Sequence, residues 1–451
     1  MSTTYNYSAY IASGDSTITR FSWDGVAADE PEIQQLASYP LDGYVLGATN
    51  LTADPCHTLV FGTTSLGNPI LMDTAGSTEF GEDLYYAAQT NTSGSTVVSL
   101  GDGFFYRPID DSSRSSFAVN YLGDVAMTSL GVSGFPSLVT TASKPYQKVG
   151  RDPTSGRVAI LGGTTTTSFL SVVTLKTPAV LSVDDTAKTI TLSDTTGVVD
   201  GASIILGIPD AREDLSRTVT VQSVDENVVT LSGSPTLSDK TVRALTGWPE
   251  ASSVLLDEAV SDISWPEGYT PNIGKSYSLA VAGDYVYNVL EEDASDAFSI
   301  ARVNITTGDT ENVVTGLTKR AGWSLPPLAT IPSVDGESVA LLYADTGSPY
   351  NLMMVENAGG VTPGTPISLG QPRESGTFAY NIATAPIPSS CVPTPAPTQA
   401  PCDDVTCSPA PDPYYCPSEA SSSSVVIPLT ILLVLLAVGL SVSIAILVKN
   451  K

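Results

Sequence analysis

A stretch of 24 uncharged residues near the C-terminus, Val425–Val448, constrains this chain more than any other feature. It reads VVIPLTILLVLLAVGLSVSIAILV and is followed by Lys449-Asn450-Lys451. As a helix it would rise about 36 Å, which exceeds the roughly 30 Å of a bilayer's hydrocarbon core. A buried helix of a soluble protein usually shows a polar face, and this stretch has none. The sequence therefore predicts one membrane-spanning helix at 425–448, with residues 449–451 as a cytoplasmic tail.

The charges on either side of this stretch predict the orientation of the chain. Lys449 and Lys451 follow it, whereas the residues just before it are acidic or neutral. Because lysines near a membrane span mark its cytoplasmic end, residues 1–424 are expected on the outer side, at a cell surface or on a viral envelope. The first residues, MSTTYNYSAYIASGDSTITRF, contain no basic segment followed by an apolar one, so they predict no signal peptide. A tail-anchored protein whose large domain faces the cytosol is therefore the alternative.

The charge balance limits the classes of partner that the chain is expected to bind. Acidic residues outnumber basic ones by 47 to 20, which gives a net charge of −27. Nucleic acids and anionic lipid surfaces are bound through Lys and Arg, so no nucleic-acid partner is expected. Thr, Ser, Gly and Val are abundant, and such a composition favours strands and turns over helices. An all-β fold is expected before the apolar stretch.

Short apolar runs separated by turn residues recur through residues 1–177 and 247–385. The clearest unit has the run Tyr285–Leu290, a charged loop, the alternating run Phe298–Val303 and a Thr-Gly-Asp turn. Such units begin about 40 to 60 residues apart, which is the spacing of β-propeller blades. Six blades are expected, or seven if Thr377–Tyr380 pairs with the N-terminus to close the ring. This rhythm resembles the blades of extracellular β-propeller proteins, and a pair of β-sandwiches is the alternative fold.

Residues 178–246 interrupt this spacing with short runs of their own. Four runs separated by turn residues predict strands: Thr189–Leu192, Ser203–Leu206, Thr218–Val221 and Val228–Leu231. They predict a small β-barrel inserted between the first part of the propeller, residues 1–177, and the second part, residues 247–385. The segment DDTAKTITLSDTTGVVDGASIIL resembles small β modules of virion structural proteins. One enlarged blade is the alternative.

Residues 386–424 join the expected propeller to the membrane and are rich in Pro, Cys and Ser. Ten prolines between Pro386 and Pro417 favour an extended stalk. Four cysteines in it predict two disulfides, with three pairings open: Cys391, Cys402, Cys407 and Cys416. A zinc site is the alternative, although no CxxC pair and no nearby histidine support it. Disulfides need an oxidising compartment, which agrees with an external domain.

Four Asn-x-Ser/Thr sequons agree with the same location and are candidate glycosylation sites: Asn6, Asn50, Asn91 and Asn304. The motif recurs by chance in a Ser/Thr-rich chain. The four together, rather than any one of them, therefore indicate an external glycoprotein.

The single histidine, His57, excludes most catalytic arrangements. A Ser-His-Asp triad would need it, and no G-x-S-x-G surrounds any serine. Neighbouring acids such as Glu82-Asp83, Asp110-Asp111 and Glu291–Asp293 could instead serve a carbohydrate-active enzyme, which needs two carboxylates about 5 to 10 Å apart. We expect these acids to be solvated loop residues. No catalytic residue and no enzyme are therefore expected.

No cofactor is expected, and no metal site is predicted. Asp293-Ala294-Ser295-Asp296 offers two carboxylates, but the complete calcium-loop motif is absent. Ca²⁺ is the one cofactor that this pattern leaves open.

Three tryptophans beside Gly or Pro are candidate ligand contacts: Trp248, Trp265 and Trp323. Exposed aromatic side chains on blade loops are well suited to stack on sugars or grip peptides. The alternative is that these rings wedge between blades as core residues. In the apolar stretch, Gly439 and Ser443 lie four residues apart, a spacing that favours close helix packing and leaves a homodimer through the transmembrane helix open.

Together these features predict a single-pass membrane glycoprotein that displays a β-propeller on a disulfide-braced stalk. The expected function is binding or adhesion to a protein or glycan ligand at the cell surface, without catalysis. A carbohydrate-active enzyme that uses loop carboxylates and a structural protein of a virion envelope are the alternatives.

Overall fold

The computed structural model is all-β, with 30 strands and no helix among the residues it describes. The described residues are 4–13, 17–26, 34–40, 50–54, 59–63, 69–73, 98–101, 104–111, 114–122, 127–132, 146–163, 168–207, 217–233, 243–248, 258–260, 263–271, 279–293, 295–318, 326–347, 350–370 and 379–386. The predicted all-β class is confirmed. None of these residues forms a membrane-spanning helix. The predicted stalk and the apolar stretch 425–448 lie outside the described residues.

The chain divides into two compact units, Met1–Val392 and Pro393–Lys451. All of the described residues belong to the first unit, which contains seven sheets. Six of the sheets are numbered 1 to 6 in the order in which the chain forms them, beginning with the sheet that holds the N-terminus.

Sheets 1 to 3 come from the N-terminal third, except for one strand. Sheet 1 has the order β30 (Ala379–Pro386), β1 (Thr4–Ser13), β2 (Thr17–Val26), β3 (Gln34–Pro40). Sheet 2 has the order β4 (Asn50–Asp54), β5 (Leu59–Thr63), β6 (Pro69–Asp73). Sheet 3 has the order β7 (Val98–Gly101), β8 (Phe104–Asp111), β9 (Arg114–Leu122), β10 (Met127–Val132).

Sheets 4 to 6 follow in the same antiparallel pattern. Sheet 4 has the order β11 (Tyr146–Arg151), β12 (Arg157–Gly163), β13 (Ser168–Thr174), β20 (Glu258–Val260). In sheet 5, both β21 (Tyr269–Pro271) and β22 (Ala280–Ala282) pair with β23 (Tyr285–Glu292), followed by β24 (Ala297–Asn304) and β25 (Thr310–Thr318). Sheet 6 has the order β26 (Leu328–Pro332), β27 (Val339–Ala344), β28 (Leu352–Val355), β29 (Ile367–Gly370).

The first edge strands of these six sheets contact one another in a closed cycle. β30 contacts β4, β4 contacts β7, β7 contacts β11, β11 contacts β22, β22 contacts β26, and β26 returns to β30. Successive antiparallel sheets whose inner strands form a ring are the arrangement of a β-propeller, in which stacking covers faces that one sheet alone would leave exposed. The chain is therefore all-β with a propeller-type arrangement of its sheets.

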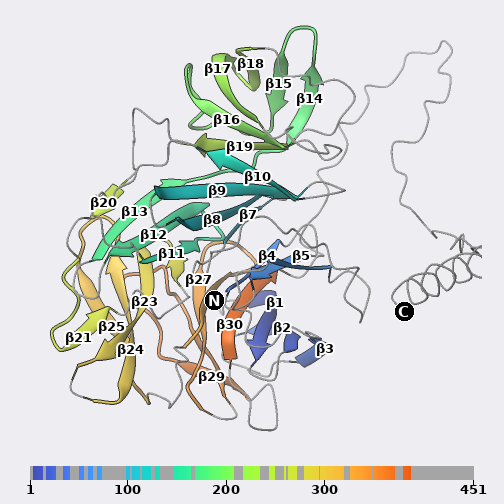
Figure 1. The fold of residues 1–451 in the computed structure, drawn as a ribbon. Helices are drawn as coiled ribbons and strands as arrows, with labels where there is room; N and C mark the ends of the chain where they lie inside the picture. The colour runs from blue at the N-terminus through green and yellow to red at the C-terminus, as the bar shows by residue number, and fades with distance from the viewer. Residues whose placement is uncertain are drawn as a thin grey trace, which may run out of the picture. The chain divides into compact units, whose positions relative to one another are not determined.

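The two ends of the first unit meet in sheet 1. Strand β30 pairs with β1, with Tyr7 opposite Pro386 and Ile11 opposite Ile382, and Figure 1 shows the two strands side by side. The C-terminal segment therefore does pair with the N-terminus. It completes sheet 1 as its inner strand, and it adds no seventh sheet to the cycle.

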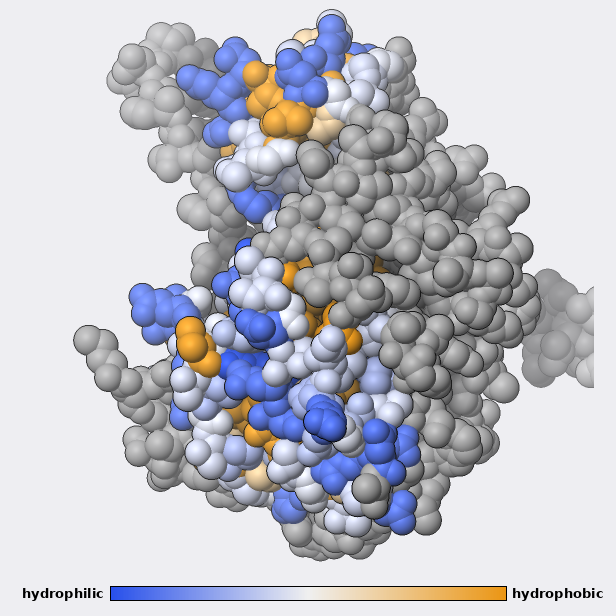
Figure 2. All heavy atoms as spheres, turned by 90° about the vertical axis from the view of Figure 1, so that its left-hand side faces the viewer, coloured by the Kyte–Doolittle hydropathy of each residue, from blue (hydrophilic) through white to orange (hydrophobic). Residues whose placement is uncertain are grey.

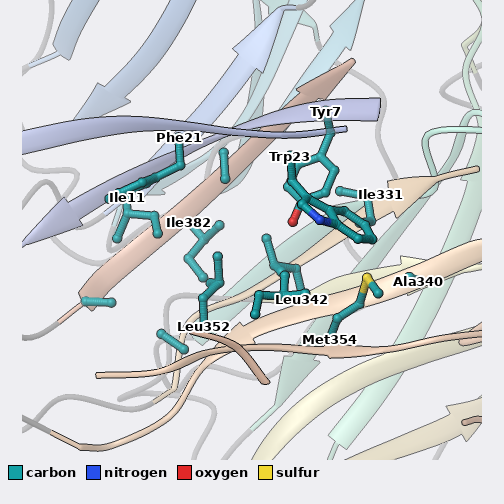
Figure 3. Packing of buried hydrophobic residues seen from close by; sticks show 14 of the residues in the cluster. Tyr7, Ile11, Phe21, Trp23, Ile331, Ala340, Leu342, Leu352, Met354 and Ile382 are labelled. Atoms are coloured by element: carbon teal, nitrogen blue, oxygen red, sulfur yellow. The ribbon is translucent and has the colours of Figure 1, made fainter. Parts of the chain in front are cut away.

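Successive side chains of a strand point to opposite faces of its sheet, and in a strand such as β12 both sets include buried apolar residues. The core therefore lies between successive sheets. In β12, Val158 and Ile160 pack with Phe104 of sheet 3, while Ala159 and Leu161 pack toward sheet 5. The seam between sheets 6 and 1 is filled by a cluster that includes Tyr7, Trp23, Ile331, Leu342 and Ile382 (Figure 3).

The inserted sheet lies in the chain between β13 and β20. Its order is β14 (Val180–Asp184), β15 (Thr189–Leu192), β18 (Val228–Leu231), β17 (Arg217–Asp225), β16 (Ser203–Gly207), β19 (Arg243–Trp248). It has its own core, made by residues such as Ile190, Ile204 and Val229. The predicted small β-barrel is a curled half-barrel sheet, because β14 and β19 are its two edges and do not pair with each other in the described part.

The inserted sheet is joined to sheet 4 by backbone contacts. Lys176 and Thr246 form an antiparallel bridge, and Leu245 packs into the core that also holds Leu175. Gly247 has a φ of 80°, and a Cβ at that position would lie 2.2 Å from the carbonyl oxygen of Thr174. Only glycine permits this close approach of two backbones.

Candidate functional site

A fully buried lysine lies in the seam between sheets 4 and 5. Lys148 belongs to β11, the inner strand of sheet 4, and has no exposed surface. Its neighbour Val149 faces sheet 3, so the alternation of the strand turns Lys148 toward sheet 5. A charged side chain is almost never fully buried unless it has a partner, so this position calls for a specific explanation.

The partner of Lys148 is Asn288, which is also fully buried, in the middle of β23. The Lys148 Nζ donates a hydrogen bond of 2.7 Å to the Asn288 Oδ1. The Asn288 Nδ2 has no acceptor among the described residues. The two side chains thus tie sheet 4 to sheet 5 and leave donor capacity unused.

Burial lowers the pKa of the Lys148 ammonium from 10.5 to about 7. The cause is the loss of hydration, which penalises the charged form. At neutral pH the amine is therefore present in both protonation states, which is unusual for a lysine.

A buried aspartate lies at the end of the same strand. The Asp152 side chain accepts hydrogen bonds from the hydroxyls of Thr154 and Ser155 and from the backbone N–H of Gly283 in sheet 5. The Gly283 bond is 3.1 Å long and crosses the seam. The Asp152 oxygens are thus committed to a turn and to the neighbouring sheet rather than to Lys148.

A solvent-exposed part of this seam carries an ion pair. The Arg157 Nη1 lies 2.5 Å from the Asp284 Oδ1, and the Asp284 side chain is 60% exposed. Solvent screens a pair with that exposure, so it orients the two sheets more than it stabilises them. The seam therefore changes from a solvated ion pair to a dry amine–amide contact within a few residues.

The seam between sheets 5 and 6 also contains a buried cation, an arginine. Arg302 of β24 is 1% exposed and donates to the backbone carbonyl oxygens of Gly360 and Val361. It also pairs with Glu311, and Tyr287 donates a 2.7 Å hydrogen bond to the Ala358 carbonyl oxygen. In contrast to Lys148, Arg302 has an acceptor for each nitrogen of its guanidinium group.

The three predicted tryptophan contacts fall in different places. Trp248 ends strand β19 opposite Ser203, so it lies in a strand and not in the expected loop. Trp265 is half-buried against the seam of sheets 4 and 5, and its Nε1 donates a 3.0 Å hydrogen bond to the Ser168 Oγ. Trp323 lies outside the described residues. The role of the three rings in ligand binding stays a prediction.

The predicted modification sites are only partly described. Asn6 lies in β1 and Asn50 in β4, while Asn91 and the disulfide candidates Cys391, Cys402, Cys407 and Cys416 lie outside the described residues. The Asn304 Oδ1 accepts the backbone N–H groups of Thr306 and Thr307, which fixes a turn at the end of β24. Glycosylation and disulfide formation stay predictions.

The described carboxylates near Asp293 take part in local hydrogen bonds. The Thr270 hydroxyl donates to Asp293, and the hydroxyls of Ser295 and Ser299 donate to Glu292, which lowers the pKa of that carboxyl. Within the described ranges, no three His, Cys, Asp or Glu side chains come together as metal ligands. The acids at 82–83 lie outside those ranges.

The sequence analysis missed Lys148 and Asn288. The signal for Asn288 was present, because an asparagine interrupts the apolar run of β23 and a buried amide needs partners. Nothing in the alternation of β11 marks Lys148 as buried, since a lysine on the edge strand of a sheet is normally solvated.

No protein-family model and no curated protein matches the chain. Among solved structures, it is similar to a candidate 6-phosphogluconolactonase from Bacteroides fragilis, with 12% identity, a TM-score of 0.35, and coverage of 84% of this chain and 98% of that one. A second candidate 6-phosphogluconolactonase, from Bacteroides uniformis, has 10% identity, a TM-score of 0.35, and coverage of 83% and 99%. The β-propeller domain of Cps50 (Swd1) from Myceliophteria thermophila has 10% identity, a TM-score of 0.31, and coverage of 74% and 88%.

These similarities correct one prediction. The prediction that the chain is not an enzyme is wrong, because two of the similar structures are candidate lactonases. At these identities and TM-scores, the likeness assigns no activity to this chain. The propeller-type assignment rests on the sheet order and on the cycle of inner strands described above.

Proposed function

We propose that this chain is a membrane-tethered surface protein that uses its propeller-type body to present the inserted sheet to a protein or glycan ligand. The tether is the apolar stretch Val425–Val448, and the Pro-rich residues 386–424 form the stalk. The tether and the stalk are supported by sequence alone.

The observation that carries the binding proposal is the distribution of exposed apolar side chains. Among the described residues, five large hydrophobic side chains are exposed: Leu181, Val199, Val228, Val334 and Val361. Three of the five belong to the inserted region, and Figure 2 shows apolar side chains gathered among polar ones over it. Exposed apolar groups that gather on one module favour an interaction surface.

The strand register places one of these side chains, Val228, on the same face as two hydroxyl groups. Thr191 of β15 lies opposite Ser182 of β14 and opposite Val228 of β18, and the Ser182 and Thr191 hydroxyls are 2.7 Å apart. Leu181 is the extra residue of a bulge beside Ser182, which leaves it exposed on the outer side. Apolar and hydroxyl groups therefore alternate across this face, a surface that suits a glycan or a polar protein segment.

Cross-links within the propeller-type body favour a body that holds its sheets in one arrangement while it presents a ligand site. Lys148 and Asp152 tie sheets 4 and 5, and Arg302 ties sheets 5 and 6. Buried, hydrogen-bonded cross-links of this kind fix neighbouring elements in one arrangement.

The experiment compares variants of the full chain displayed on cells in an adhesion assay against glycan-coated and protein-coated surfaces. We expect the double variant Leu181→Asp, Val228→Asp to lose most of the adhesion while its surface level stays unchanged. Val334→Asp is the matched control, because Val334 is more exposed but lies outside the inserted region. Equal adhesion of the double variant and the wild-type chain would contradict the proposal, as would an equal loss in the control.

The tether needs a test of its own. Full chain and a chain lacking Val425–Val448 are compared by detergent phase separation. We expect the full chain in the detergent phase and the shortened chain in the aqueous phase. Recovery of both in the aqueous phase would remove the tether from the proposal.

A further inference from the structure

Lys148 and Asn288 bring together hydrogen-bond donors that exceed the acceptors available to them. A lysine ammonium has three N–H donors and no acceptor, and a carboxamide has two donors and one oxygen. The one protein contact of the Lys148 Nζ in the described part of the chain is the Asn288 Oδ1 at 2.7 Å. The Asn288 Nδ2 has no acceptor in that part of the chain.

This donor cluster is closed off from bulk water. Both side chains have no exposed surface. Two residues beyond Lys148, a Cβ added to Gly150 would lie 2.5 Å from the Leu279 carbonyl oxygen and 3.1 Å from the Val281 Cγ2. The face of β11 that carries Lys148 therefore lies directly against the inner strand of sheet 5, and Lys148 reaches past that strand to Asn288.

The cluster also carries a charge that no carboxylate balances in the described residues. The closest acid along β11 is Asp152, whose oxygens are taken by Thr154, Ser155 and Gly283. The other charged groups of β11, β12 and β23 are Arg151, Arg157, Glu291 and Glu292, and none of them pairs with Lys148. Buried donors without acceptors are costly and are normally satisfied by a guest that accepts hydrogen bonds.

We propose that Lys148 and Asn288 form a buried site for a small monovalent anion, of the size of chloride or nitrate, between sheets 4 and 5. The anion accepts hydrogen bonds from the Lys148 Nζ and the Asn288 Nδ2 and balances the ammonium charge. Water could satisfy the same donors but would leave the charge unbalanced. Charge balance therefore favours the anion over water.

The site would join the two sheets through the anion. Sheets 4 and 5 follow one another in the cycle of inner strands, so a bound anion stabilises the closed ring and not only one seam. An anion that binds the folded chain and not the unfolded chain raises the thermal stability. At anion concentrations above the dissociation constant, the increase is proportional to the logarithm of the concentration.

The test measures the melting temperature of the full chain, purified in a non-ionic detergent, against sodium chloride and sodium nitrate concentration. For the wild-type chain we expect a logarithmic rise, of about 2 °C for each tenfold increase in anion concentration above the dissociation constant. Lys148→Met should lose this rise. Lys176→Met is the matched control, since Lys176 is a partly exposed lysine paired with Asp194, and it should keep the rise.

A second variant keeps the test decisive if Lys148→Met does not fold. Asn288→Asp places a fixed carboxylate beside the lysine, so it should abolish the response to chloride while it keeps or raises the melting temperature. In crystals grown with sodium bromide, an anomalous bromide peak is expected within hydrogen-bond distance of the Lys148 Nζ. An equal salt response in all four chains, or a water with no bromide peak at this position, would overturn the proposal.

Discussion

The guanidinium carbon of Arg302 lies 3.7 Å from the centroid of the Tyr285 ring, in the seam between sheets 5 and 6. The arginine is 1% exposed, and its N–H groups are taken by Glu311 and by the carbonyl oxygens of Gly360 and Val361. A planar, fully paired cation on an aromatic face is a specific way to join two sheets, because Lys cannot reproduce the fork.

Replacement of Arg302 by Met should lower the free energy of unfolding by about 2 to 3 kcal/mol, because two partly buried carbonyl oxygens lose a charged donor. Arg302→Lys should cost less, since it keeps the charge over the ring. Denaturant titration of both variants gives the difference. As a control, Lys176→Met breaks an ion pair with Asp194 that is partly exposed, and it should cost about 0.5 kcal/mol or less. Similar costs at positions 302 and 176 would contradict the structural role of Arg302.

A pair of Tyr→Phe substitutions separates a satisfied buried hydroxyl from one without a protein partner. The Tyr287 hydroxyl donates to the Ala358 carbonyl oxygen, so Tyr287→Phe should destabilise the chain by about 1 kcal/mol. The Tyr7 hydroxyl is buried beside Trp23 and has no partner in the described residues, so Tyr7→Phe should be neutral or stabilising. Thermal and denaturant unfolding measure both. A larger loss for Tyr7→Phe would show that its hydroxyl has a partner.

The buried amine of Lys148 should make stability depend on pH in a definite direction. Its pKa is about 7 in the folded chain and 10.5 in the ordinary case, so the unfolded chain binds more protons between these values. Stability therefore rises with pH across this window, by up to about 1.4 kcal/mol per pH unit, and the destabilisation by Lys148 is complete below pH 7.

In buffer without small monovalent anions, Lys148→Met should therefore be more stable than the wild-type chain near neutral pH, and the difference should shrink as the pH rises toward about 10. Denaturant titrations of both chains at a series of pH values measure this difference, in which the contributions of all other groups cancel. A difference that is constant with pH would contradict a lowered lysine pKa.

Substitution of two glycines distinguishes the energetic cost of a steric clash from the cost of an unfavourable backbone conformation. A Cβ at Gly150 would lie 2.5 Å from the Leu279 carbonyl oxygen, so Gly150→Ala must push sheets 4 and 5 apart and should cost about 2 kcal/mol or more. Gly197 has a φ of 82° and open space around it, so Gly197→Ala should cost only about 1 kcal/mol for the backbone conformation. Melting temperatures of the two variants test this order, and the reverse order would contradict the tight contact of β11 with sheet 5.

Sequence patterns alone predicted the all-β class and the strands of several units. The runs at Tyr285–Leu290 and Phe298–Val303 lie within β23 and β24, because alternation and turn residues act over a few neighbouring residues. The break of period at residues 178–246 likewise corresponds to a separate sheet with its own core.

The tertiary structure alone decided which strands close the ring and what the buried charges do. Strand β30 completes sheet 1 as its inner strand, and β14 does not pair with β19 in the described part of the inserted sheet. Both outcomes depend on pairing between segments far apart in the chain. Lys148 and Asn288 are 140 residues apart, and the residues around either one do not predict contact with the other. Their contact follows from the stacking of two sheets, since the fold, and not the neighbouring residues, removes both side chains from water.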